Sequence, residues 1–281
     1  PDSSTSRGLG DVYKRQLFVE IELSSLQRAN RKPTDTLSSY ELLLKGKALH
    51  HKVQKDALLN ALDTFDSAIK ADEKNGQAYA WKACALGQGL FRGYIEEDFS
   101  VVWKQAEDNL KKARELNEND FEVHRLMSEV TLAMKDFRAA QRHSKLAYDM
   151  VPNDPRVLSV YGDVCVRTGK VDEGVDALKL ALDLDPIPQG KTNADPRHAG
   201  LLFAYYMSRD KDGCLEQIGN LDEIDVRSWL ITTKICSDEE HDYENLDWFK
   251  EGKTQIMVST TVPFISGIPR VMIQEISYIA L

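Results

Sequence analysis

Small and apolar residues recur along the chain with a period of 34 positions. When residues 121–154 are aligned with residues 155–188, the small residues and the closing prolines coincide: Ser128 with Gly162, Ala140 with Gly174, Ala147 with Ala181 and Pro152 with Pro186. A fixed period of this length is the signature of a repeat architecture, in which each unit buries its apolar face against its neighbours. The pattern therefore predicts stacked repeats.

The second half of this unit appears twice more, nearer the start of the chain. The two copies carry the trios Ala106, Leu110, Ala113 and Ala61, Phe65, Ala68. A spacing of four and then three positions puts each trio on one face of a helix, and small residues let a second helix approach closely. The pattern predicts helix pairs over about 38–71, 76–116, 120–151 and 154–186, which together form one segment, 38–186.

The predicted pairs differ in length. The second pair carries about ten extra residues, 91–100, that are rich in aromatic and acidic side chains, and the first gains about three at 51–55. Insertions between the helices of a repeat project at one edge and often carry specificity, but the sequence favours the simpler interpretation, a packed loop extension. Trp81 and Trp103 flank the longer insertion and would pack, anchor it or contact a ligand.

After Pro186 the period weakens. Residues 187–196 indicate a loop, and helical patterns follow at 197–208, 211–220 and 226–235, so 187–236 is expected to hold degenerate capping helices. The remaining residues, 237–281, form an atypical tail. Its last thirty residues are strand-like or irregular, which suggests a small β-type cap, a new domain or sequence foreign to the repeats.

The start of the chain also stands apart. Residues 1–16 are rich in turn formers and resemble translated sequencing-linker sequence, so we expect a non-native or disordered leader. Residues 17–37 are expected to form an amphipathic leading helix and a linker. The first residue is not methionine, which suggests a fragment of a longer protein.

Charge and cysteine usage narrow the function. Lys+Arg number 36 and Asp+Glu 45, so the net charge of −9 argues against a broad nucleic-acid or anionic-membrane surface. No apolar run approaches the length of a membrane span. The four cysteines are far apart, with no CxxC, as expected for a soluble cytoplasmic protein without disulfides or a zinc site.

Motifs for catalysis or cofactor binding are absent from the sequence. It contains no P-loop, GxGxxG, HExxH or GxSxG, and we expect no catalytic residue, cofactor or metal. His50 and His51 are adjacent, but neighbours on a helix point about 100° apart, which favours a solvated pair over a metal site. The acidic clusters lie where they would complement helix N-termini.

The spacing of small residues carries a family resemblance. In residues 155–188 they stand at the eighth, twentieth and twenty-seventh places, with proline at the thirty-second: Gly162, Gly174, Ala181 and Pro186. This combination resembles the tetratricopeptide repeat, from Ser38 to Pro186. The resemblance implies an all-α fold, a right-handed α-α superhelix of four to six helix pairs with an irregular C-terminal tail, and a protein-protein interaction or scaffolding function.

In such a stack the first helix of each pair lines a groove. The resemblance implies that these candidate groove residues face a peptide: Lys47, His50, Gln77, Gln88, Glu122, Arg125, Glu129, Arg156, Ser159, Asp163 and Arg167. Glu129 and Asp163 stand where the carboxylate-binding subfamily needs an amide, so a chaperone-tail clamp is not expected. Charge reversal at Arg125 and Arg167 is expected to weaken binding and to leave the fold intact. Alternatively, the stack only spaces or dimerises domains of a larger protein.

A second resemblance lies just before the repeats. Residues 31–46, preceded by a helix that ends Leu26-Gln27-Arg28-Ala29, are similar to the junction at which a TolB-like domain passes into the repeats of bacterial adenylate/guanylate cyclases. Winged-helix DNA-binding transcriptional regulators share that junction. The resemblance implies the C-terminal regulatory part of a signalling protein, with any cyclase site outside this chain. The partner would be a protein, a peptide or another domain of the parent, and this region would bind neither nucleic acid nor membrane.

Overall fold

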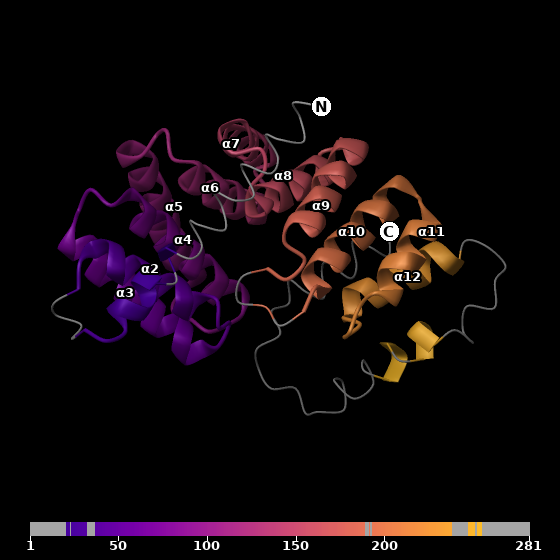
Figure 1. Cartoon of the computed structure of the whole chain (residues 1–281), viewed down its shortest axis with the longest axis horizontal. Helices are drawn as coiled ribbons and strands as arrows, with labels where there is room; N and C mark the ends of the chain where they lie inside the picture. Colours follow the sequence, from indigo (N-terminus) through magenta and orange to yellow (C-terminus); the bar gives the residue numbers. More distant parts are fainter. Residues whose placement is uncertain are drawn as a thin grey trace. The chain divides into compact units, whose positions relative to one another are not determined.

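The computed structural model describes residues 21–22, 24–32, 37–188, 191, 193–237, 247–250 and 252–254. Within these ranges every regular element is an α-helix (Figure 1), which confirms the all-α expectation. The named helices are α2 (Ser39–His50), α3 (Lys55–Ala71), α4 (Gly76–Phe91), α5 (Phe99–Leu116), α6 (Phe121–Ala133), α7 (Phe137–Met150), α8 (Pro155–Arg167), α9 (Val171–Leu184), α10 (Asp195–Ser208), α11 (Lys211–Gly219) and α12 (Val226–Ser237). The expectations for residues 1–16 and for nearly all of the tail lie outside the described residues.

Consecutive helices pack as pairs in the first of two compact units, which ends at Val160. Helix α2 packs on α3, α4 on α5 and α6 on α7. These are the segments in which the 34-residue period predicts helix pairs. The buried core of this unit consists of the small and apolar residues of that period, among them Ala61, Ala68 and Ala113.

Close approach within a pair depends on small residues. Phe65 of α3 is fully buried, and a Cβ atom added at Gly46 of α2 would overlap its ring. The α2–α3 seam therefore requires glycine at position 46, because the aromatic ring occupies the space of a side chain. Gly46 is the eighth residue counted from Ser39, the place that Gly162 takes in residues 155–188.

Side-chain caps fix where several helices begin. Ser38 and Glu41 form a capping box at the start of α2, and the Asp120 carboxylate accepts hydrogen bonds from the backbone N–H groups of Glu122 and Val123. These groups have no partner inside the helix, so each cap stabilises its N-terminus by roughly 1 kcal/mol. Asp136 caps α7 in the same way.

The insertion of the second pair mainly lengthens its helices. Helix α4 continues to Phe91 and α5 begins at Phe99, so the connecting loop is only 92–98. Trp103 stacks on Phe99 with ring centroids 5.5 Å apart, and the edge of Phe91 contacts the same indole. The Tyr94 hydroxyl donates to the Val53 carbonyl at 3.2 Å. These contacts hold the insertion against the helix pair, as expected for a packed extension.

The second unit begins at Tyr161, inside α8. A Cβ atom added at Gly162 would overlap Leu178 of α9. The α8–α9 contact therefore requires glycine at position 162, as the α2–α3 contact does at position 46. Helix α10 packs against α9, α11 and α12. Residues 247–250 and 252–254 are helical, which corrects the expectation of a strand-like tail for 252–254. They lie against α12, where the Trp229 indole N–H donates to the Phe249 carbonyl at 3.0 Å.

Candidate functional site

The first helices of successive pairs lie side by side in the first unit. Helix α4 packs against both α2 and α6, and Arg156 at the start of α8 reaches Glu122 of α6. We call the side of α2, α4, α6 and the start of α8 that carries the candidate groove residues the first-helix face. It is the surface on which the sequence predicts peptide binding.

A buried ion network crosses the first-helix face. Its centre is the Glu122 carboxylate, which lies 3.0 Å from Arg125 Nε, 3.6 Å from Arg156 Nη1 and 4.0 Å from Lys47 Nζ. Burial alone would raise the pKa of Glu122, but the three cations hold that pKa below its usual range. Glu122 is therefore ionised, and the network joins α2, α6 and α8.

The network extends at both sides. Arg125 Nη1 lies 2.8 Å from the Glu129 carboxylate, and Arg156 Nη2 lies 2.7 Å from Asp154. On α2, Lys47 Nζ lies 2.9 Å from Glu22, a residue of the helical turns that precede α2. The candidate groove cations are thus paired within the fold, and Arg125 is only 5% exposed. This corrects the expectation that reversing its charge would leave the fold intact.

Trp81 of α4 lies at the middle of this face and is 3% exposed. Lys47 Nζ and the Arg125 guanidinium lie 5.4 and 5.5 Å from its ring centroid, within cation–π range. The sequence pattern places Trp81 and Trp103 at the two flanks of the insertion, and the printed ring contacts with Phe91 and Phe99 are made by Trp103. A signal existed: Trp81 lies four positions after Gln77 and seven before Gln88, on the helical face that they predict.

His50 of α2 packs edge-on against Trp81, with ring centroids 5.4 Å apart, and is 7% exposed. Burial, helped by His51, Arg125 and Arg92, lowers the pKa of His50 to about 3. The expectation of a solvated histidine pair is therefore wrong for His50, because α4 covers its ring. In the described part of the chain, no three His, Cys, Asp or Glu side chains gather closely enough to hold a metal ion.

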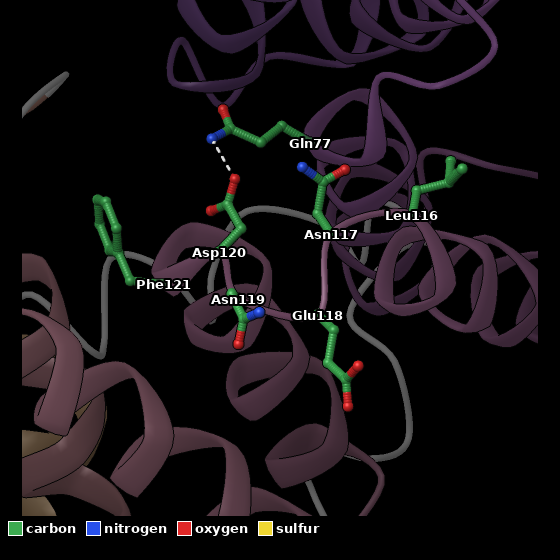
Figure 2. A pocket seen from close by; sticks show the side chains of 7 residues that line it. All are labelled: Gln77, Leu116, Asn117, Glu118, Asn119, Asp120 and Phe121. Atoms are coloured by element: carbon green, nitrogen blue, oxygen red, sulfur yellow. Dashed lines mark hydrogen bonds between the residues drawn. The ribbon is translucent and has the colours of Figure 1, made fainter.

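Gln77 lies at the start of α4, beside the turn between α5 and α6. Figure 2 shows it lining a pocket of about 540 Å³ together with Leu116, Asn117, Glu118, Asn119, Asp120 and Phe121. The Gln77 side-chain amide donates to the Asp120 carboxylate at 2.9 Å, and Asn117 Oδ1 accepts from the Gly76 backbone N–H at 3.0 Å. The polar side chains of this pocket thus tie α4 to the α5–α6 turn.

The remaining candidate residues do not join the network. The Ser159 hydroxyl donates to the Pro155 carbonyl at 2.7 Å, within α8. Asp163 and Arg167 belong to the second unit, where they form an i,i+4 ion pair at 2.8 Å, and Arg167 lies 4.8 Å from the ring centroid of Phe203. The structure therefore brings Lys47, His50, Glu122, Arg125, Glu129 and Arg156 together, with Gln88 farther along α4.

Comparisons with known proteins identify solved structures that have a similar fold. No family model and no curated protein matches the sequence. Among solved structures, one from the functional characterisation of PilF of Pseudomonas aeruginosa has a TM-score of 0.52 and 14% identity and covers 94% of this chain and 99% of its own. None of the described helices is long and apolar enough to cross a membrane.

Two further structures support the same fold. The tetratricopeptide protein TTC0263 of Thermus thermophilus has a TM-score of 0.51 and 18% identity, covering 78% of this chain and 100% of its own. A chain of the APC/C hetero-tetramer Cut9–Hcn1 has a TM-score of 0.56 and 16% identity, covering 78% of this chain and 39% of its own. With the paired helices, these likenesses show that the chain has the all-α solenoid fold of tetratricopeptide-repeat proteins.

Proposed function

We propose that this chain is a protein-protein interaction module that binds a peptide segment of a partner on its first-helix face. The observation that carries the proposal is the side-by-side packing of α2, α4 and α6, which sets one face of each first helix in a continuous row. The chain acts through binding rather than catalysis. The net charge of −9 favours a protein partner over nucleic acid or an anionic membrane.

The buried ion network suits this role. Ion pairs that join α2, α6 and α8 fix the spacing of the first helices before any partner arrives. A preorganised receptor loses little conformational entropy on binding, so more of the contact energy appears as affinity. An extended or helical peptide laid across these helices would meet a rigid surface.

The proposal also covers the kind of larger protein to which this module belongs. Residues 31–46 support a C-terminal regulatory part of a bacterial adenylate/guanylate cyclase-type protein in the cytoplasm, and the same residues support a winged-helix regulator as the alternative. Lys32 pairs with Glu41 at 2.6 Å in this junction. Sequencing the natural open reading frame upstream of Pro1 distinguishes the two candidate parent proteins, because it should encode either a cyclase domain or a winged-helix domain. A reading frame that encodes neither domain would exclude both candidates.

Site-specific photocrosslinking tests the binding face. Ala133, at the exposed end of α6 on the first-helix face, would be replaced by a photoreactive phenylalanine, and Arg114 on the outer helix α5 would serve as the matched control. A synthetic peptide library is irradiated with each variant, and labelled peptides are identified by mass spectrometry. We expect saturable labelling at position 133 that excess unlabelled peptide suppresses. Equal labelling at both positions, or none at 133, would contradict the proposal.

A further inference from the structure

A carboxylate of the chain itself occupies one place on the first-helix face. The helical turns before α2, residues 21–22 and 24–32, which we call the leading segment, bring Glu22 to Lys47 of α2. Lys47 Nζ donates a hydrogen bond to Glu22 Oε1 at 2.9 Å, and the two side chains are only 6% and 12% exposed. Water screens exposed ion pairs, whereas this pair is largely shielded from it. The structure therefore shows how an acidic side chain binds at Lys47.

Lys47 Nζ depends on that carboxylate for its hydrogen bond. Among the described residues the next acidic oxygen, Glu122 Oε1, lies 4.0 Å from Nζ, beyond hydrogen-bond range. The Trp81 ring centroid lies 5.4 Å from the same nitrogen, so the ring attracts the ammonium group but offers it no lone pair. An ammonium group has three N–H donors, and burial removes the water that would satisfy them. Lys47 therefore requires an acceptor from outside the helix pairs.

The other polar groups around Lys47 do not replace Glu22. Arg125 and Arg92 lie close enough to act on His50, but a guanidinium group carries donors only. Burial is the main cause that lowers the pKa of His50 to about 3, so its imidazole is neutral at pH 7 and supplies no negative charge. An acidic side chain is thus the group that this place fits.

Departure of Glu22 would leave no buried carboxylate unpaired. The Glu122 carboxylate keeps Arg125 Nε at 3.0 Å and Arg156 Nη1 at 3.6 Å. Glu22 itself lies in the first described turn of the leading segment and would pass into water. Lys47 alone would lose its hydrogen bond, so the vacated place favours a carboxylate from a partner. The net charge of −9 does not oppose this, because salt screens charges more than about 8 Å away.

The leading segment is held on this face by few apolar contacts. Its covered residues include Glu22, Ser25 and Ala29, which stand at i, i+3 and i+7 and so share one side of a helix. Ser25 is 6% exposed and Ala29 is fully buried, and of the described residues in this segment Ala29 alone belongs to the core cluster. A segment with so little buried apolar surface opens at low cost. A partner helix with an acidic residue and a small residue seven positions later reproduces its contacts.

We propose that Lys47 anchors a subsite for an acidic side chain of a helical partner peptide, and that Glu22 is a built-in stand-in that the partner displaces. The subsite rests on the proposed function, because it assigns the chemistry of one residue of the bound peptide. The partner's glutamate or aspartate accepts the hydrogen bond from Lys47 Nζ, and the leading segment leaves the face. A tethered competitor has an effective concentration in the millimolar range, so it raises the apparent Kd of the partner.

Peptide binding to the intact chain tests the subsite. The probe is a fluorescently labelled synthetic peptide with the sequence of residues 17–31, and its binding is followed by fluorescence anisotropy. Glu22→Gln weakens the chain's own contact with Lys47, so this variant should bind the probe about ten-fold more tightly than the wild type does. Lys32→Gln is the matched control, because it removes the exposed pair of the same segment with Glu41, and it should bind as the wild type does. Equal binding by the wild type and Glu22→Gln, or no binding by either, would overturn the proposal.

A second probe identifies the group that Lys47 recognises. It is the same peptide with the change Glu22→Gln, and it should bind the Glu22→Gln chain about ten-fold more weakly than the first probe, because it offers no carboxylate. Lys47→Met keeps the length of the side chain and removes its charge, so this variant should bind both probes equally. A preference for the first probe that persists in Lys47→Met would refute the assignment of Lys47.

The wild-type chain gives a result even where a variant fails to fold. Saturating unlabelled probe is added to the ¹⁵N-labelled chain, and hydrogen exchange of residues 24–29 of the labelled chain is measured by mass spectrometry. Displacement should speed their exchange several-fold, because the probe takes their place on the face, whereas the outer helix α5 should exchange as before. Unchanged exchange of residues 24–29 at saturation would contradict displacement.

The two proposals fail in different ways. If Ala133 crosslinks library peptides but Glu22→Gln leaves binding of the probe unchanged, the module binds peptides without an acidic anchor at Lys47. If Glu22→Gln tightens binding of the probe but no peptide is labelled at position 133, the subsite stands and the peptide path along α6 is wrong. Enrichment of aspartate or glutamate among the labelled peptides is the outcome expected when both hold.

Discussion

Gly46 and Gly87 are both buried helical glycines, yet their surroundings are opposite. A side chain at position 46 would overlap the buried Phe65 ring, whereas one at position 87 would meet open space. Replacing glycine by alanine inside a helix stabilises it by roughly 0.5 to 1 kcal/mol when no clash follows, because alanine loses less backbone entropy on folding.

We therefore expect Gly87→Ala to raise the free energy of unfolding by up to about 1 kcal/mol. Gly46→Ala should lower it by about 1 to 3 kcal/mol, because the core must shift to admit the methyl group. Urea denaturation followed by circular dichroism measures both. Equal effects of the two substitutions on the free energy of unfolding would contradict the contrast between the filled space at Gly46 and the open space at Gly87.

His50 makes stability depend on pH in a defined direction. Its pKa is near 6.5 when unfolded and about 3 when folded, so between these values the unfolded chain binds the proton and the folded chain does not. The free energy of unfolding should fall as pH decreases from 6.5 towards 3. The limiting slope is about 1.4 kcal/mol per pH unit for one histidine.

The window between pH 6.5 and 5 keeps the contribution of carboxylates small, because most of them remain ionised there. His143, whose pKa is lowered to about 4 mainly by burial and by the neighbouring His124, adds to the same slope. His50→Gln should flatten the dependence, measured by urea denaturation at a series of pH values. A slope identical to that of the wild type would mean that His50 is protonated in the folded state.

At the scale of elements, Arg125 tests how the first helices are joined. Its side chain is 6% exposed and contacts Glu122 and Glu129, whereas the Arg167 side chain is 31% exposed and pairs with Asp163 along α8. Arg125→Glu should cost about 3 to 5 kcal/mol, because it leaves buried carboxylates together without their cation. Arg167→Glu should cost at most about 1 kcal/mol, since water screens an exposed pair.

Thermal unfolding of the two charge-reversal variants provides the measurement. If Arg125→Glu melts at the wild-type temperature, the ion network does not hold α6 in position.

Helix positions themselves were predictable from the sequence, because small residues at places such as Ala61 and Ala147 recur at helical spacing. The burial of Arg125 was not, because a charged residue at a predicted groove position looks exposed until its partners from other helices are known.

For the whole molecule, the solenoid fold predicts uneven local stability. In such folds each pair contacts only its neighbours, so protection depends on how much of each helix is buried. Helix α4 buries Trp81 and eight other residues, whereas α11 buries Gly213, Cys214, Gln217 and Ile218. Hydrogen exchange followed by mass spectrometry should show slower exchange in α4 than in α11. Uniform protection throughout would indicate one cooperative core instead of a stack.

The sequence by itself determined the helical repeat, the length of the pairs and the seams of small residues, because these follow from local periodicity and from the space that one side chain leaves for the next helix. Only the tertiary structure decided what the first-helix face is made of. It buries His50, encloses Trp81 between two cations and neutralises Lys47 with carboxylates from elsewhere in the chain. These contacts join residues that are far apart in the sequence, and no period along the chain encodes the distance between side chains on different helices.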